Sequence, residues 1–208
     1  MLKKSICFFL IAVSFESLGT VDLQVYNKDN RKNMTFCRAE GIGDGLFFTA
    51  AHCVLGIKKE EIIIENTEIS NIKTHGFYNK NFIYNQLDFA IIETTKKDSK
   101  VHFKEARKGM VVTILSHKAI ITEIFETEFK INFFDTSVCL NDSGSGAYSD
   151  GKLIGILSRG SRKCESFAYI TKASIIETFK EDFHGLEPLA LKYKKDFIVK
   201  MIKFNLGK

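Results

Sequence analysis

The sequence predicts an all-β protein in which two small β subdomains precede helical segments at the C-terminal end. Short runs of β-branched and aromatic residues recur between turn signals along most of the chain, in two series of similar weight. Hydrophobic residues take up helical spacing only after Ala173. The 208 residues are 45% hydrophobic and 26% charged, which is the composition of a globular protein and excludes a disordered or fibrous chain.

The N-terminal end has the pattern of an export signal. Lys3 and Lys4 precede an apolar run over residues 6–15, and small residues up to Gly19 offer cleavage points. The alternative, an N-terminal membrane anchor, fits less well because the run is short for a bilayer. We therefore expect residues 1–19 to be a signal peptide and the mature protein to be secreted or periplasmic, without a stable membrane span.

The predicted strands recur at the short intervals typical of a β-barrel or β-sandwich. Residues 94–108 between the two series are charged and turn-rich, as surface connections usually are. We expect two subdomains, about 20–100 and 101–172, within one domain over 20–186. The predicted strands are residues 23–26, 46–49, 61–65, 89–93, 111–115, 120–125, 128–133, 152–157 and 167–170.

The C-terminal end changes from the period of strands to the period of helices. Apolar residues at Ile175, Phe179 and Phe183 are separated by Glu and Lys, which predicts an amphipathic helix over 173–184. In residues 187–208, apolar residues are mixed with many lysines. This tail is either a second packed helix or a basic amphipathic surface element, and the pattern does not separate the two.

The charges exclude one class of partner. The net charge of +5 is modest, and the basic residues are interspersed with acidic ones along the chain. A protein that follows the phosphates of a nucleic acid usually carries a basic stripe instead. We therefore expect no nucleic-acid partner.

The cysteines are consistent with an oxidising compartment. Cys7 falls in the expected signal peptide, and the other four cysteines suit two disulfides, for which three pairings exist. A zinc site is the alternative, but the chain has no CxxC pair and its histidines lack ligand spacing. These four cysteines are Cys37, Cys53, Cys139 and Cys164.

Three short segments carry the residues of a nucleophilic site. His52 follows small residues at the end of an apolar run, and Asp88 immediately precedes an apolar strand, where an isolated carboxylate is costly unless it has a partner. Ser143 lies in the glycine-punctuated turn Asn-Asp-Ser-Gly-Ser-Gly, as a nucleophile needs when its hydroxyl must be exposed. Each segment alone has a blander interpretation, as a structural histidine, a turn aspartate or a linker.

Together, in the order His52, Asp88 and Ser143, the three segments resemble the chymotrypsin/trypsin family of serine endopeptidases. Residues 74–78 resemble the family's His-Pro-x-Tyr segment, and residues 155–161 resemble the strand that lines its substrate cleft. The likeness runs from about residue 25 to residue 179. It implies two six-stranded antiparallel β-barrels, a Cys37–Cys53 disulfide around the histidine segment and a Cys139–Cys164 disulfide near the serine.

The resemblance also implies the roles of the site residues. Ser143 would be the nucleophile, His52 the general base and later acid, and Asp88 the carboxylate that orients the imidazole. The backbone N–H groups of Asn141 and Ser143 would form the oxyanion hole. Asn141 replaces the usual glycine, and asparagine tolerates left-handed backbone conformations better than most residues. Ser145 is the competing nucleophile, but it occupies the family's glycine position.

The resemblance gives less about specificity. Ser137 would lie at the base of the primary pocket, where an aspartate would favour cleavage after Lys or Arg, so the pattern is closer to the chymotrypsin-like preference for large apolar side chains. Phe167 stands where a small residue usually keeps the pocket open. Arg159 replaces the usual tryptophan beside the cleft and, with Lys163, could favour acidic substrates, although both could equally face solvent. The expected substrate-binding residues are Ser137, Ser158, Arg159, Gly160 and Phe167.

The sequence therefore predicts a secreted serine endopeptidase that acts as a monomer on polypeptide substrates, with no metal or organic cofactor implied. The Ile-Val-Gly-Gly segment of animal zymogens is absent and the loops are short, which resembles bacterial secreted members. What neutralises Asp142 is left open. Two alternatives remain: a catalytically impaired homologue that binds peptides or a partner, and an adhesin or membrane-active toxin that uses the basic tail.

Overall fold

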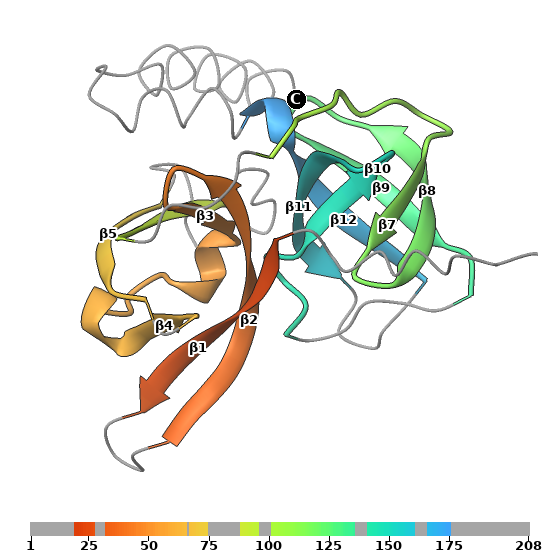
Figure 1. The fold of residues 1–208 in the computed structure, drawn as a ribbon. Helices are drawn as coiled ribbons and strands as arrows, with labels where there is room; N and C mark the ends of the chain where they lie inside the picture. Colours follow the sequence, from red (N-terminus) through yellow and green to blue (C-terminus); the bar gives the residue numbers. More distant parts are fainter. Residues whose placement is uncertain are drawn as a thin grey trace, which may run out of the picture.

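The fold consists of two six-stranded antiparallel β-sheets that lie side by side (Figure 1). The computed structural model describes residues 19–27, 32–65, 67–74, 88–95, 101–135, 141–160 and 166–175. Within these ranges the secondary structure is almost entirely β-strand, with two short 3₁₀ helices. The predicted all-β class with two six-stranded antiparallel units is confirmed.

The first sheet is an open half-barrel with the strand order β4-β1-β2-β3-β6-β5. The two outermost strands of this sheet approach each other at one point, where a single bridge links Ile64, at the end of β4, to Thr67, two residues before β5. The 3₁₀ helix η1 (Ala51–Cys53) follows β3, and η2 (Lys59–Glu61) precedes β4. The strands are β1 (Thr20–Asn27), β2 (Lys32–Gly43), β3 (Leu46–Thr49), β4 (Ile62–Ile64), β5 (Ile69–Thr74) and β6 (Ala90–Thr94).

The second sheet is a closed barrel with the strand order β10-β11-β12-β9-β8-β7. The barrel closes where β10 pairs with β7, through Ala147 with Ile114 and Tyr148 with Thr113, so that it leaves no free edge. The strands are β7 (Val111–Ile114), β8 (His117–Ile124), β9 (Glu128–Phe133), β10 (Gly146–Ser149), β11 (Lys152–Gly160) and β12 (Phe167–Lys172).

Three hydrophobic clusters hold the sheets together. One fills the closed barrel and another fills the half-barrel. The third contains Phe48 and Ile91 of the first sheet together with Leu153 and Ile156 of the second, so it lies between the two. Burying each such side chain contributes roughly 1.5–3 kcal/mol to folding. The third cluster therefore fixes the position of one sheet relative to the other.

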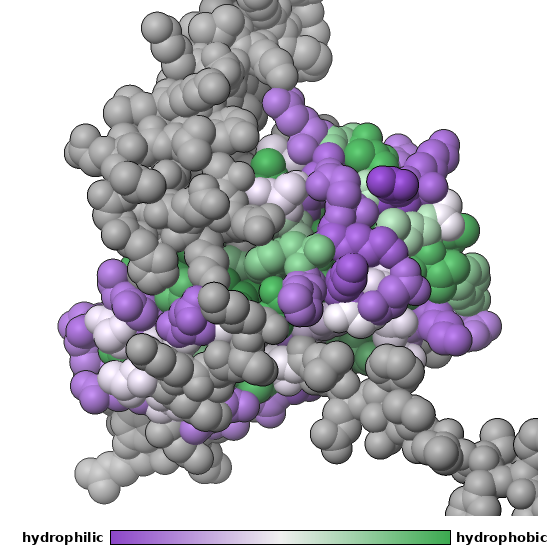
Figure 2. Space-filling model, turned by 45° about the horizontal axis from the view of Figure 1, so that its top comes forward, coloured by the Kyte–Doolittle hydropathy of each residue, from purple (hydrophilic) through white to green (hydrophobic). Residues whose placement is uncertain are grey.

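The surface shows no comparable gathering of apolar side chains in the part of the chain that the structure describes. Hydrophilic and hydrophobic residues are interspersed over the face in Figure 2. The exposed large hydrophobic residues are Leu55, which follows η1, and Val111, Ile124 and Phe134, which lie on or directly after strands of the second sheet. In the described ranges we find no helix long and apolar enough to cross a membrane.

Most predicted strands coincide with observed ones, and the differences have a local cause. The expected strands over 46–49 and 128–133 are β3 and β9. The long strand β2 was not predicted, because it contains charged residues and glycines, which are uncommon in strands. The chain is helical at 173–175. The rest of the predicted helix, the C-terminal tail and residues 1–18 lie outside the described residues.

Close packing of β11 on β12 requires a glycine at position 155. A Cβ atom there would lie 2.3 Å from the Thr171 carbonyl oxygen and 2.6 Å from Ile170 Cγ2. We predict that Gly155→Ala lowers the free energy of unfolding by about 1–3 kcal/mol, because strand backbone must move to admit the methyl group. Urea unfolding followed by circular dichroism measures the change.

The matched control is Gly41→Ala in β2, where the nearest atom to the added Cβ would be a Phe47 ring carbon at 3.4 Å. This variant should stay close to the wild type. Equal stabilities of the two variants would contradict the packing assigned to Gly155.

Candidate active site

His52 and Asp88 meet where two neighbouring strands, β3 and β6, carry the chain to the same end of the first sheet. Thr49 at the end of β3 pairs with Ala90 at the start of β6. His52 follows in η1, and Asp88 lies two residues before β6. The His52 Nδ1 atom is 2.7 Å from Asp88 Oδ2, and the His52 backbone N–H donates to Asp88 Oδ1 at 2.9 Å. The carboxylate thus holds both the ring and the backbone of this histidine.

Asp88 is almost fully buried, with 4% of the surface of the residue exposed. Burial of a carboxylate is costly unless donors replace its water. A third donor is the hydroxyl of Ser158 on β11, at 3.1 Å from Oδ2. Because Oδ2 is an acceptor only, the Nδ1 atom of His52 must carry the hydrogen, which leaves Nε2 free to accept a proton.

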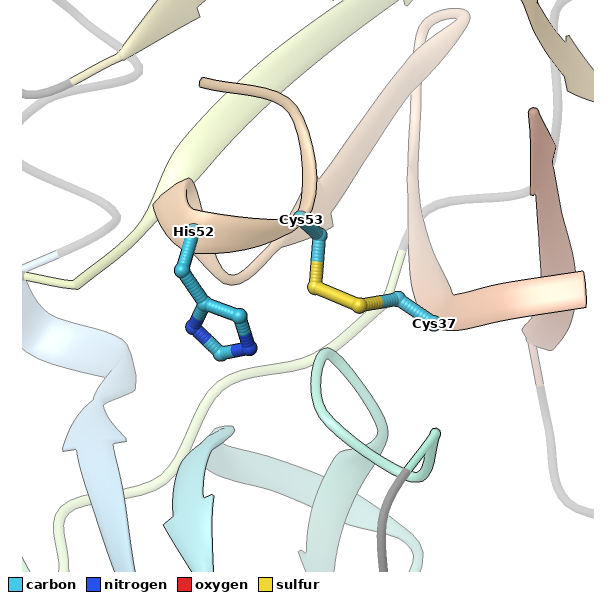
Figure 3. Close-up of side chains that lie close together, drawn as sticks. All are labelled: Cys37, His52 and Cys53. Carbon is cyan, nitrogen blue, oxygen red and sulfur yellow. A yellow bond between two sulfur atoms is a disulfide. The ribbon is translucent and has the colours of Figure 1, made fainter. Parts of the chain in front are cut away.

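A disulfide braces the histidine segment, as the sequence predicted. Cys37 of β2 is bonded to Cys53, which follows His52 directly, and the two Cα atoms are 6.1 Å apart. Figure 3 shows the His52 ring and this disulfide leaving the same short turn. The two sulfur atoms and a His52 ring nitrogen lie within 4.8 Å of one another. These three residues do not form a zinc site, because zinc binds cysteine as the thiolate and the two sulfur atoms are bonded to each other.

The Ser143 turn is held from two sides. On one side, the Arg38 N–H of β2 donates to the Ser143 carbonyl at 2.8 Å. On the other, the Gly144 N–H donates to the Leu157 carbonyl at 2.7 Å, and the Leu157 N–H donates to the Ser145 carbonyl at 2.8 Å. The turn therefore lies between β2 of the first sheet and β11 of the second, next to the histidine segment.

The backbone of this turn favours small or permissive residues. Gly144 has φ +93°, and a Cβ atom there would lie 1.9 Å from the Arg38 carbonyl oxygen, so no other residue fits. Asn141 has φ +81°, a region that asparagine tolerates. Ser143 is half-buried, whereas Ser145 is fully buried and its hydroxyl has no partner among the described residues. Of the two serines, only Ser143 is accessible to a substrate.

The serine and the histidine are close but are not hydrogen-bonded. The Ser143 carbonyl oxygen is 4.0 Å from the Cys53 sulfur, adjacent to His52. The described contacts of the two residues include no bond between the Ser143 hydroxyl and the imidazole. In proteins without substrate, catalytic hydrogen bonds are often long and tighten only in the complex.

Arg159 is bound to neighbours and does not stand free in solvent. Its guanidinium donates to Glu128 Oε1 at 2.6 Å and lies over the Tyr169 ring, with Cζ 4.3 Å from the centre of the ring. Burial raises the pKa of Glu128, and Arg159 opposes that rise. Phe167 is half-buried at the start of β12, with Lys130 Nζ 5.2 Å from the centre of its ring. Gly160 is exposed at the end of β11.

Glu40 is a buried acid that the sequence analysis missed. It lies on β2 with no exposed surface, and it accepts hydrogen bonds from Thr20, Tyr148 and the Gly146 N–H. Burial raises its pKa from 4.5 to about 7, although the three donors oppose the shift. An acid inside the otherwise small and apolar run Ala39–Gly43 was the available signal.

Several predicted residues lie outside the described part of the chain. Asp142 lies in the Ser143 turn, where its carbonyl accepts from the Ser145 N–H at 3.1 Å. The residues outside the described ranges are Ser137, Cys139, Lys163 and Cys164, together with the predicted second disulfide and most of segment 74–78.

Comparison with known proteins supports the fold. No protein-family model matches the sequence, and no curated protein matches it either. Among solved structures, the chain is similar to the scabies mite inactivated protease paralogue S-I1, with a TM-score of 0.66 and 15% sequence identity. The match covers 81% of this chain and 94% of the other. The chain has a chymotrypsin-like fold. At this identity the likeness establishes the fold alone.

The disulfide should contribute measurably to stability. It closes a loop of 16 residues, and in the chain-entropy description such a link stabilises the folded state by about 3 kcal/mol. We predict that the double variant Cys37→Ala with Cys53→Ala loses an amount of this order in urea unfolding. Addition of reductant should lower the wild-type unfolding midpoint and leave that of the variant unchanged. An equal response of both proteins would contradict this assignment.

The titration of Glu40 gives the stability a pH dependence of known sign. Its folded-state pKa of about 7 lies above the ordinary 4.5, so the folded protein binds more protons between these values. Stability from this group is therefore fully present below about pH 4.5 and is lost as the pH rises through 7. We predict a loss of about 3 kcal/mol between pH 4 and pH 8, measured as the difference between wild type and Glu40→Gln. A constant difference would contradict it.

Proposed function

We propose that this protein is a secreted serine endopeptidase that uses Ser143, His52 and Asp88. The observation that carries the proposal is the pairing of His52 with a buried carboxylate beside an accessible serine. A carboxylate buried at this cost, with three hydrogen-bond donors, is more than a turn aspartate needs. The chymotrypsin-like fold is the setting in which this arrangement hydrolyses peptide bonds.

The chemistry follows from the roles of the three side chains. Ser143 Oγ attacks the carbonyl carbon of the scissile peptide bond, and His52 Nε2 takes the hydroxyl proton. Asp88 holds the imidazole in the tautomer that can accept this proton, and it stabilises the imidazolium that forms. His52 then donates the proton to the leaving amine. Water then attacks the carbonyl carbon of the resulting ester on Ser143, and His52 Nε2 takes a proton from the water. His52 returns this proton to Ser143 Oγ as the ester bond breaks.

The oxyanion hole is assigned to the backbone N–H groups of Asn141 and Ser143. The positive φ of Asn141 supports this assignment, because it is a conformation that glycine adopts without strain. Loss of one donor in such a hole typically costs about 10²–10³ in turnover. Asparagine at this position keeps the backbone donor, and the residue is exposed.

Specificity follows the same assignment. The substrate-binding residues are Ser137, Ser158, Arg159, Gly160 and Phe167. Because Glu128 already offsets the charge of Arg159, the proposal favours an apolar or aromatic preference over an acidic one.

A catalytically impaired, peptide-binding homologue is the second candidate. It is favoured by the structural neighbour, which is named an inactivated protease paralogue. The missing hydrogen bond between Ser143 and His52 points the same way. In this function the surface around Ser143 and His52 would bind a peptide without cleaving it.

Labelling with a fluorophosphonate separates the two candidates. We predict that the reagent modifies one serine of the folded protein, that mass spectrometry places it on Ser143, and that Ser143→Ala is not labelled. Ser145→Ala is the matched control, and it should label like the wild type because Ser145 is buried. Folded wild-type protein that resists the reagent would favour the binding module.

The role of Asp88 can be tested by one conservative change. Asp88→Asn retains the size of the side chain but can favour the wrong imidazole tautomer. We predict that kcat for a peptide substrate falls by about 10⁴-fold near neutral pH, while KM changes little. Asp150→Asn, an exposed surface carboxylate, serves as control. A loss of less than tenfold for Asp88→Asn would argue against the triad.

A further inference from the structure

Glu40 lies where three segments meet at the back of the Ser143 turn. Its Oε2 atom accepts from the Thr20 hydroxyl of β1 and, at 3.1 Å, from the Gly146 N–H of β10. Its Oε1 atom accepts from the Tyr148 hydroxyl, also on β10. β10 begins three residues after Ser143. A single carboxylate therefore links the first strand of the protein to the strand that leaves the nucleophile turn.

The neighbouring contacts show what this link fixes. Arg38, two residues before Glu40 on β2, donates its N–H to the Ser143 carbonyl, and its own carbonyl accepts from Thr49 Oγ1 at 2.7 Å. β2 is thus hydrogen-bonded to the turn at two points, by the Arg38 backbone at Ser143 and by the Glu40 side chain at Gly146. Together with the hydrogen bonds of Gly144 and Ser145 to Leu157 on the other side, these two points fix the orientation of the turn relative to β2.

Among the described residues, no cation faces the Glu40 carboxylate. Arg38 lies on the same face of β2, but it pairs with Asp22, one rung along the β1–β2 ladder. Strand β3 carries no titratable side chain, and Tyr148 is the titratable residue of β10. In the Ser143 turn the charged residue is Asp142, which lies four residues before Gly146. A buried acid without a paired cation is costly even with hydrogen-bond donors, which requires a reason for its presence.

We propose that Glu40 is a positioning residue, which holds the Ser143 turn in its reactive orientation through its hydrogen bonds to Gly146 and Tyr148. This inference rests on the proposed function. Glu40 has no exposed surface and cannot touch a peptide substrate. Its loss should therefore lower turnover without weakening substrate binding.

Protonation changes this cluster in a defined way. The Gly146 N–H can only donate, so Oε2 must remain an acceptor in both states. A proton on Oε1 is donated to Tyr148, which then accepts where it had donated, whereas a proton on Oε2 is donated to the Thr20 hydroxyl while Oε2 still accepts from Gly146. In both cases the negative charge beside the Tyr148 ring is lost. The Tyr148 ring therefore reports the ionisation of Glu40. Because the chain has no tryptophan, its near-ultraviolet absorbance comes mainly from its six tyrosines.

The first experiment measures kcat and KM for a peptide substrate in three variants. We expect Glu40→Ala to lower kcat by about 10- to 100-fold, as small misplacements of reacting groups do, with KM nearly unchanged. Glu40→Gln should recover most of kcat, because its amide oxygen accepts from Gly146 and its amide group donates to Tyr148. Thr94→Val removes a buried hydrogen bond to Gly45 far from the turn, and it controls for loss of stability alone.

The second experiment does not depend on activity. The tyrosine absorbance and the Gly146 amide resonance of the wild type should both titrate with a midpoint near pH 7. Glu40→Gln should abolish both changes, and Tyr148→Phe should abolish the absorbance change only. A wild type without the Gly146 titration would overturn the proposed contact.

The two experiments separate failure of this inference from failure of the proposed function. Folded Glu40→Ala with wild-type kcat, or with a loss no greater than that of Thr94→Val, overturns the positioning role. If the wild type neither cleaves peptides nor reacts with fluorophosphonate, the proposed function is wrong. The anchoring of the turn by Glu40 is then supported or overturned by the Gly146 resonance alone.

Discussion

The buried carboxylate of Asp88 is the interaction around which the two sheets are arranged. Its three donors are the ring and backbone of His52, after β3, and the hydroxyl of Ser158, on β11. One donor segment belongs to the first sheet and the other to the second. Because a buried carboxylate without these donors would destabilise the fold by several kcal/mol, the position of the sheets and the geometry of the site are coupled.

Hydrophobic packing and backbone hydrogen bonds extend this coupling. The cluster that contains Phe48 and Ile156 presses the sheets together, and the Arg38 N–H joins β2 directly to the Ser143 carbonyl. The disulfide to Cys37 ties the histidine turn to this same strand. β2 is therefore the element that connects the histidine segment, the serine turn and the Glu40 cluster. A shift of this strand would disturb all three at once.

The fold itself does not decide between catalysis and binding. The same architecture occurs in a protein named an inactivated protease paralogue, so activity depends on details that a fold comparison does not resolve. Within the second sheet, Arg159 of β11 is paired with Glu128 of β9, so its charge is offset inside the protein.

The sequence by itself determined the β class, most strand positions, the His52, Asp88 and Ser143 segments and, through the resemblance, the Cys37–Cys53 disulfide. These features leave local signatures, since alternation, turn residues and short motifs are readable within a few positions. Only the tertiary structure revealed the long strand β2, the burial of Glu40 and the partner of Arg159. Each of these depends on residues distant in the chain, Gly146 for Glu40 and Glu128 for Arg159. Contacts at that separation arise from the register and closure of the sheets, which no local pattern specifies.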